Sequence, residues 1–81
     1  MHARAKLPAA LDELLRSDLE QAIYEANLGI DDTEIAKRYL IRQMPQIDIA
    51  AELGCDRSTI SKRMPQILRK VQRAAEKLFG K

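Results

Sequence analysis

The sequence predicts an all-α domain of four or five helices with no β-strand. Apolar residues recur at three- and four-residue steps along most of the chain, a spacing that lines one face of a helix. Proline and glycine stand between these segments, where they start or end helices. The chain has 81 residues, of which 46% are hydrophobic, 32% charged and 4% aromatic. That composition suits one small helical domain with a core of Leu, Ile, Ala and Met.

The first predicted helix runs from Pro8 to about Asn27. Residues 1–7 carry no helical pattern, and we expect them to be flexible. Pro8 suits a first helical turn, because its missing N–H would have no partner there. Gly29 would end the helix. The apolar stripe consists of Leu11, Leu14, Leu15, Leu19, Ala22, Ile23 and Ala26.

The second predicted helix starts at Asp31 or Asp32. Asp31 and Glu34 have the spacing of a capping box, in which the two side chains bond reciprocally to backbone N–H groups. The helix should end by Met44, because Pro45 disfavours helical geometry in the residue before it. Its apolar stripe consists of Ile35, Ala36, Tyr39 and Leu40.

A third and a fourth helix are predicted on either side of Gly54. Pro45 opens the third helix, and Gly54 ends it. The fourth helix begins at Asp56 or Ser58. The residues expected to face inward are Ile49, Ala50 and Leu53 in the third helix, and Ile60 and Met64 in the fourth.

Pro65 leaves two alternatives for the rest of the chain, since it either bends the fourth helix or starts a fifth. The tetrapeptide MPQI occurs at 44–47 and again at 64–67, which we interpret as two helices with similar starts. A basic C-terminal helix is expected over residues 66–79, ended by Gly80. Its apolar side either closes the core against the first helix or forms the seam of a homodimer. That side consists of Ile67, Leu68, Val71, Ala75, Leu78 and Phe79.

Residues 46–64 have the arrangement of a helix-turn-helix. Two helices that cross steeply need a small side chain at the crossing, which Ala50 supplies. Gly54 follows four residues later, where the turn needs left-handed geometry. Ile60, six residues further on, would anchor the second helix. Ile49, Leu53, Met64 and a buried Cys55 would complete the apolar contacts. The sequence therefore predicts a helix-turn-helix without a β-wing.

The second helix of this motif has a polar, basic face opposite Ile60. At about 100° per residue, Ser58 and Lys62 point away from the core. Such a face suits the major groove of DNA, where side chains donate to base edges. The candidate base-contacting residues are Arg57, Ser58, Thr59, Ser61 and Lys62. The candidate phosphate contacts are Gln46, at the start of the preceding helix, and Arg63, Arg69, Lys70 and Arg73.

Charge is distributed unevenly along the chain. Residues 1–36 carry three basic and eight acidic side chains, whereas residues 37–81 carry eleven basic and four acidic ones. A basic C-terminal half is typical of proteins that bind a polyanion. The same side chains would also serve simply to solvate two helices.

The stretch from about Asp32 to Leu78 resembles region four of the bacterial sigma factors. The resemblance is carried by IAAELGCDRSTISKRM, by the preceding DTEIAKRYLIRQ, by the Arg63–Met64 pair and by the basic helix that follows. It implies a DNA-binding fold of three or four helices, with Arg57, Ser58, Ser61 and Lys62 on the reading face. No other sigma region accompanies it, so we expect a stand-alone regulator resembling the small sigma-like proteins of phages and mobile elements.

These patterns predict a transcriptional regulator that binds double-stranded DNA sequence-specifically, with RNA polymerase and a second copy of the chain as further candidate partners. The alternative is a helical protein-interaction module that docks on RNA polymerase or another regulator. In that alternative the helix-turn-helix is only a scaffold. Salt dependence of DNA binding discriminates the two, because phosphate contacts release counterions.

Other classes of function find little support in the residues. His2 is the only histidine, and no glycine-rich phosphate loop is present, so we expect no enzyme, cofactor or metal site. No apolar run approaches the roughly 20 residues that span a bilayer, so we expect no membrane partner. The single cysteine and the lack of a signal-peptide pattern favour a cytoplasmic protein.

Overall fold

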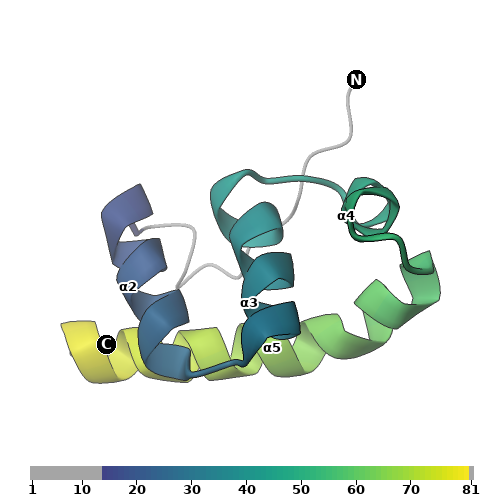
Figure 1. Cartoon of the computed structure of the whole chain (residues 1–81). Coiled ribbons are helices and arrows are strands. Elements are labelled where there is room, and N and C mark those ends of the chain that lie inside the picture. The colour runs from purple at the N-terminus through teal and green to yellow at the C-terminus, as the bar shows by residue number, and fades with distance from the viewer. Residues whose placement is uncertain (1–13, 81) are drawn as a thin grey trace.

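The computed structural model describes residues 14–80, and within this range every regular element is helical (Figure 1). The elements are α2 (Arg16–Ala26), α3 (Ile30–Ala36), the π-helical turn η1 (Lys37–Ile41), α4 (Gln46–Leu53) and α5 (Arg57–Phe79). Because η1 continues α3 directly, the described part of the chain forms four helices. The all-α prediction without a β-wing is confirmed for this part. The expected flexible residues 1–7 and the expected helix start at Pro8 lie outside it.

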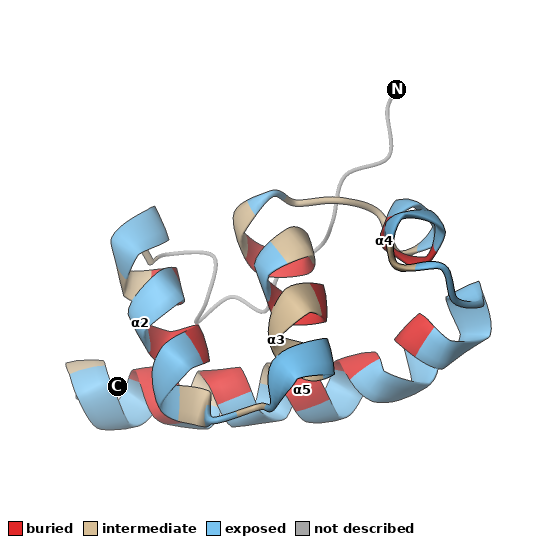
Figure 2. Ribbon diagram, viewed as in Figure 1, coloured by how far each residue is buried: buried red, intermediate tan, exposed pale blue. Residues whose placement is uncertain are grey.

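The long helix α5 forms the base of the fold. In Figure 1, α2 and the α3–η1 helix lie side by side across it, and α4 crosses its N-terminal end. The buried side of α5 faces these three elements, while its opposite side is exposed (Figure 2). None of the described helices is both long and apolar enough to cross a membrane.

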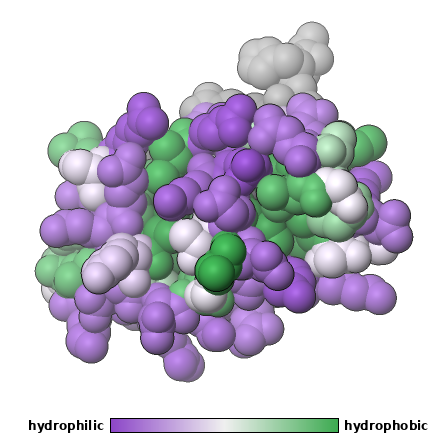
Figure 3. All heavy atoms as spheres, in the orientation of Figure 1, coloured by the Kyte–Doolittle hydropathy of each residue, from purple (hydrophilic) through white to green (hydrophobic). Residues whose placement is uncertain are grey.

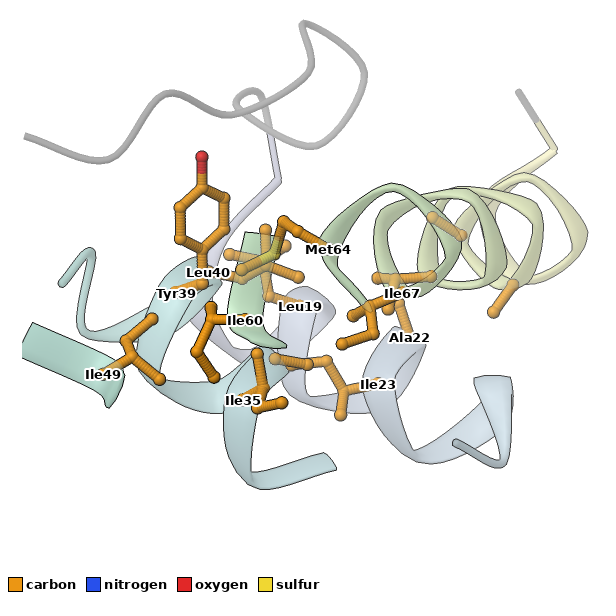
Figure 4. Packing of buried hydrophobic residues seen from close by; sticks show 14 of the residues in the cluster. Leu19, Ala22, Ile23, Ile35, Tyr39, Leu40, Ile49, Ile60, Met64 and Ile67 are labelled. Carbon is orange, nitrogen blue, oxygen red and sulfur yellow. The ribbon is translucent and has the colours of Figure 1, made fainter. Parts of the chain in front are cut away.

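One hydrophobic core joins all the elements (Figure 4). Its largest fully buried side chains are Ile23, Leu40, Ile49, Ile60, Ile67 and Val71. The stripes predicted for the second and third helices are buried, apart from Leu53, which is half-buried. The apolar side of the C-terminal segment packs within the chain against α2, so it closes the core, as one of the two alternatives predicted. Leu78 differs from the prediction, because it is 40% exposed.

The N-terminal part of α2 differs from the prediction. Leu14 and Leu15 precede the helix, and Leu15 has extended backbone angles (φ −70°, ψ 161°). That backbone turns the Leu15 side chain out of the apolar stripe, and 70% of it is exposed. The helix ends at Ala26, as expected, with Asn27 in the left-handed region at φ 54°.

The predicted start of α3 is wrong. Gly29, at φ 92°, is the N-cap residue rather than the end of the preceding helix, and no side chain caps α3. The capping box of Asp31 and Glu34 therefore does not form. Asp31 and Asp32 lie in the first turn, where negative charge favours the positive end of the helix dipole. The helix ends at Ile41, before Pro45, as predicted.

Pro65 bends a single helix rather than starting a new one. The structure has no separate helix over residues 66–79, and the second MPQI lies in the middle of α5. The apolar stripe of Ile60, Met64, Ile67 and Val71 continues on one face across the proline, so burial holds the helix together there. Pro65 itself is exposed, and α5 curves in its N-terminal part (Figure 1).

Candidate nucleic-acid interface

The helix crossing predicted from the sequence is present between α4 and α5. Ala50 is 4% exposed at the contact, and Ile60 is fully buried. Gly54 adopts φ 71°, and the N–H of Cys55 donates to the carbonyl of Ala50 at 3.0 Å, which closes the turn. A Cβ atom at Gly54 would meet nothing within 4 Å, so the glycine is needed for its backbone conformation and not for close packing.

The five candidate base-contacting residues all lie on the exposed surface of the first turns of α5. They are Arg57, Ser58, Thr59, Ser61 and Lys62. Asp56 precedes them as the N-cap residue in an extended conformation. With Ile60 held in the core, Arg57, Ser58, Ser61 and Lys62 form one small, polar and basic surface, which we call the reading face. Thr59 lies apart from it on the flank toward α3, where it borders a depression together with Asp31, Glu34 and Arg63.

Gln46 adjoins the reading face through a direct contact. The hydroxyl of Ser61 donates a hydrogen bond of 2.8 Å to the Gln46 side-chain oxygen. Gln46 stands at the first position of α4, so this bond ties the start of α4 to the middle of the reading face. The sequence predicted Gln46 as a phosphate contact, and its bond to Ser61 was not predictable from spacing alone.

Arg63 lies on a different flank of α5 and is already paired. Its guanidinium donates to the carboxylate of Asp32 at 2.6 Å, which joins α5 to the first turn of α3. The Asp32 carboxylate raises the pKa of Arg63, so the arginine stays charged. Of the predicted phosphate contacts, Arg63 is therefore held by an ion pair, whereas Gln46 is held by its hydrogen bond with Ser61.

The outward stripe of the reading face continues along α5. Seven residues make nearly two helical turns, so Arg69 lies within about 20° of Lys62 around the helix axis, and Arg73 lies on the same side. Arg69, Lys70 and Arg73 are all exposed. Lys70 and Arg73 also border a shallow depression shared with Glu25 of α2. A basic track thus runs from the N-terminus of α5 toward its C-terminal half.

An ion-pair network fixes α4 against the preceding helix. Arg38 donates to Glu52 at 2.9 Å and to Glu34 at 2.6 Å, and Arg42 lies 3.3 Å from Glu52. The Arg38 guanidinium, through these hydrogen bonds, lowers the pKa of both Glu34 and Glu52. The sequence analysis missed this network, although the four-residue spacing of Glu34 and Arg38 is a known signal for a helical ion pair.

Cys55 does not have the predicted environment. The sequence suggested a buried thiol at the turn, but Cys55 is exposed. The reason is that the turn carries the chain away from the core between Gly54 and Asp56, so only Leu53 packs inward there. Among residues 14–80, no group of His, Cys, Asp and Glu side chains is arranged to hold a metal ion.

The chain matches no protein family, no curated protein and no solved structure. The candidate interface therefore stands on its own geometry.

Proposed function

We propose that the protein binds double-stranded DNA sequence-specifically and acts as a transcriptional regulator. The observation that carries this proposal is the reading face on α5, held outward by the crossing of Ala50 and Ile60. An exposed helical face with small polar and basic side chains fits the major groove, where Arg and Lys donate to guanine and Ser contacts several bases. Arg57 and Lys62 are the proposed base-contacting cations.

Phosphate contacts would come from both sides of the reading face. Gln46 stands at the start of α4, where the first backbone N–H groups of a helix have no intrahelical partner. Arg69, Lys70 and Arg73 extend the basic track beyond the reading face. In its resemblance to sigma region four, the proposed regulator would read DNA as a promoter-reading domain does, as a monomer or a homodimer.

A second candidate function is docking on a protein such as RNA polymerase. Tyr24 and Ile30 are 87% and 85% exposed on α2 and α3. Acidic side chains accompany them: Asp18, Glu20, Glu25, Asp31, Asp32 and Glu34. Apolar patches also interrupt the hydrophilic surface in Figure 3. Basic side chains also lie beside Tyr24, which borders a depression together with Arg16, Lys37 and Arg42. The exposed apolar area, rather than one sign of charge, is therefore what favours a protein partner.

Salt dependence of DNA binding tests the proposal against this second candidate. Fluorescence anisotropy with a labelled duplex should show affinity that falls steeply with added salt, since three to five phosphate contacts give a slope of about −2.7 to −4.5 in log affinity against log salt. The variant Lys62→Ala should lower the affinity. Lys77→Ala is the matched control, because Lys77 lies at the far end of α5 and pairs with Glu25 at 3.5 Å. Absence of binding at about 150 mM salt would favour the docking function.

A further inference from the structure

Ile47 is an exposed apolar side chain beside the reading face. It is 59% exposed in the first turn of α4, while Ile49 and Ala50 of the same helix are buried. Gln46, the residue before it, accepts the hydrogen bond from Ser61. The first turn of α4 is therefore in contact with the middle of the surface proposed to enter the groove.

The contacts of α4 fix the direction in which Ile47 points. Glu52 pairs with Arg38, so that side of α4 faces the α3–η1 helix. Five residues separate Ile47 from Glu52, which places them about 140° apart around the helix axis. Gln46, which reaches α5, points in a third direction, about 100° from Ile47 and about 120° from Glu52. Ile47 consequently lies on a side of α4 that faces away from α3 and η1, one residue along from the side chain that contacts α5.

The chemistry of the major groove suggests what this side chain meets. The edges of the bases there carry donors and acceptors, and the one apolar group is the C5-methyl of thymine. A branched apolar side chain cannot bond to a base edge or a phosphate, but it gains by covering a methyl group. We propose that Ile47 contacts a thymine methyl and so specifies a thymine within the bound site. This inference rests on the proposed DNA-binding function.

The test removes the methyl group from the DNA and the side chain from the protein. The duplex is the one selected by the wild-type protein from a random library, and each thymidine is replaced in turn by deoxyuridine. We expect one position at which the replacement weakens wild-type binding about fourfold, the worth of one buried methyl group. The variant Ile47→Ala should bind more weakly and lose its response to deoxyuridine at that position alone. Because Ile47 is exposed, the variant should melt like the wild type.

Ile30→Ala is the matched control, since Ile30 is 85% exposed but starts α3, away from the reading face. This variant should keep the wild-type response to deoxyuridine. Equal responses of the wild type and Ile47→Ala at every position would refute the inference while leaving specific DNA binding intact. A uniform loss of affinity in Ile47→Ala would refute it too, and would indicate packing on deoxyribose. If the wild-type protein selects no sequence, the proposed function fails and this inference with it.

Discussion

Pro65 lies inside α5, and its replacement by alanine should stabilise the fold. Proline in a helix interior is about 3 kcal/mol less favourable than alanine, because it lacks the N–H for the carbonyl four residues earlier and its ring clashes there. That carbonyl belongs to Ser61 of the reading face. Pro65 is exposed, so its removal sacrifices no core contact. The curvature of α5 relieves part of the clash already, so we expect a gain of about 1–3 kcal/mol in the free energy of unfolding.

Urea unfolding followed by far-ultraviolet circular dichroism measures this gain. For a domain of this size, each 1 kcal/mol should raise Tm by about 4–8 °C. Pro45→Ala is the matched control, because Pro45 precedes α4 with φ −62° and ψ 154°, a conformation that proline prefers. Alanine there should leave the free energy of unfolding unchanged or lower it by about 0.4–1 kcal/mol, because alanine gives the unfolded chain more conformational freedom than proline does. A Pro65→Ala variant no more stable than the wild type would refute the reasoning.

Three further predictions concern the core, the ion-pair network and the basic track. Ile60→Ala should cost about 2–5 kcal/mol in urea unfolding, because Ile60 is fully buried, whereas Leu78→Ala, at a 40% exposed site, should cost far less. The pKa of Glu52 is lowered in the folded state, so the ionised carboxylate stabilises the fold above about pH 4.3, and this stabilisation is lost as the pH falls through the folded-state pKa. The variant Glu52→Gln should therefore show a smaller loss of stability at acid pH than the wild type. An equal loss in the two proteins would contradict this. Arg69→Ala should weaken binding to all duplexes alike and reduce the magnitude of the salt slope by about 0.9, so a change in sequence preference would contradict its role as a phosphate contact.

The two copies of MPQI show what local sequence can and cannot predict. The first copy begins α4, because Gln43 just before it is in the left-handed region at φ 55° and the preceding helix has ended. The second copy lies within α5, because buried residues on both sides of Pro65 continue one stripe. The same four residues thus precede and begin one helix but lie inside another, according to the burial of the residues around them. Rules based on local sequence do not include this tertiary burial.

The reading face was predictable, whereas the contacts that support it were not. Helical periodicity from Ile60 was enough to place Ser58 and Lys62 outward. The hydrogen bond from Ser61 to Gln46 spans 15 residues of sequence, and the ion pair of Arg63 with Asp32 spans 31. Both therefore depend on how the helices cross. The exposure of Ile47 could have been found from the same periodicity, because its position falls off the stripe of Ile49 and Ala50.

The structure shows where the acidic side chains of the N-terminal half lie. The acidic side chains gather on α2 and the start of α3, whereas the basic track follows the outward side of α5. Two of these acidic residues are nevertheless paired with basic residues of α5, Glu25 with Lys77 and Asp32 with Arg63. The excess of basic side chains on the outward side of α5 is the feature on which the proposed DNA binding relies.

Selection of duplexes from a random library at about 150 mM salt, run in parallel with the wild type and Lys62→Ala, tests the central claim most directly. The proposed function predicts that the wild type enriches one motif, and that Lys62→Ala relaxes the preference at one position and loses about 1–3 kcal/mol of affinity. No enriched motif with a folded wild-type protein, or an unchanged motif and affinity with Lys62→Ala, would contradict the assignment of the reading face.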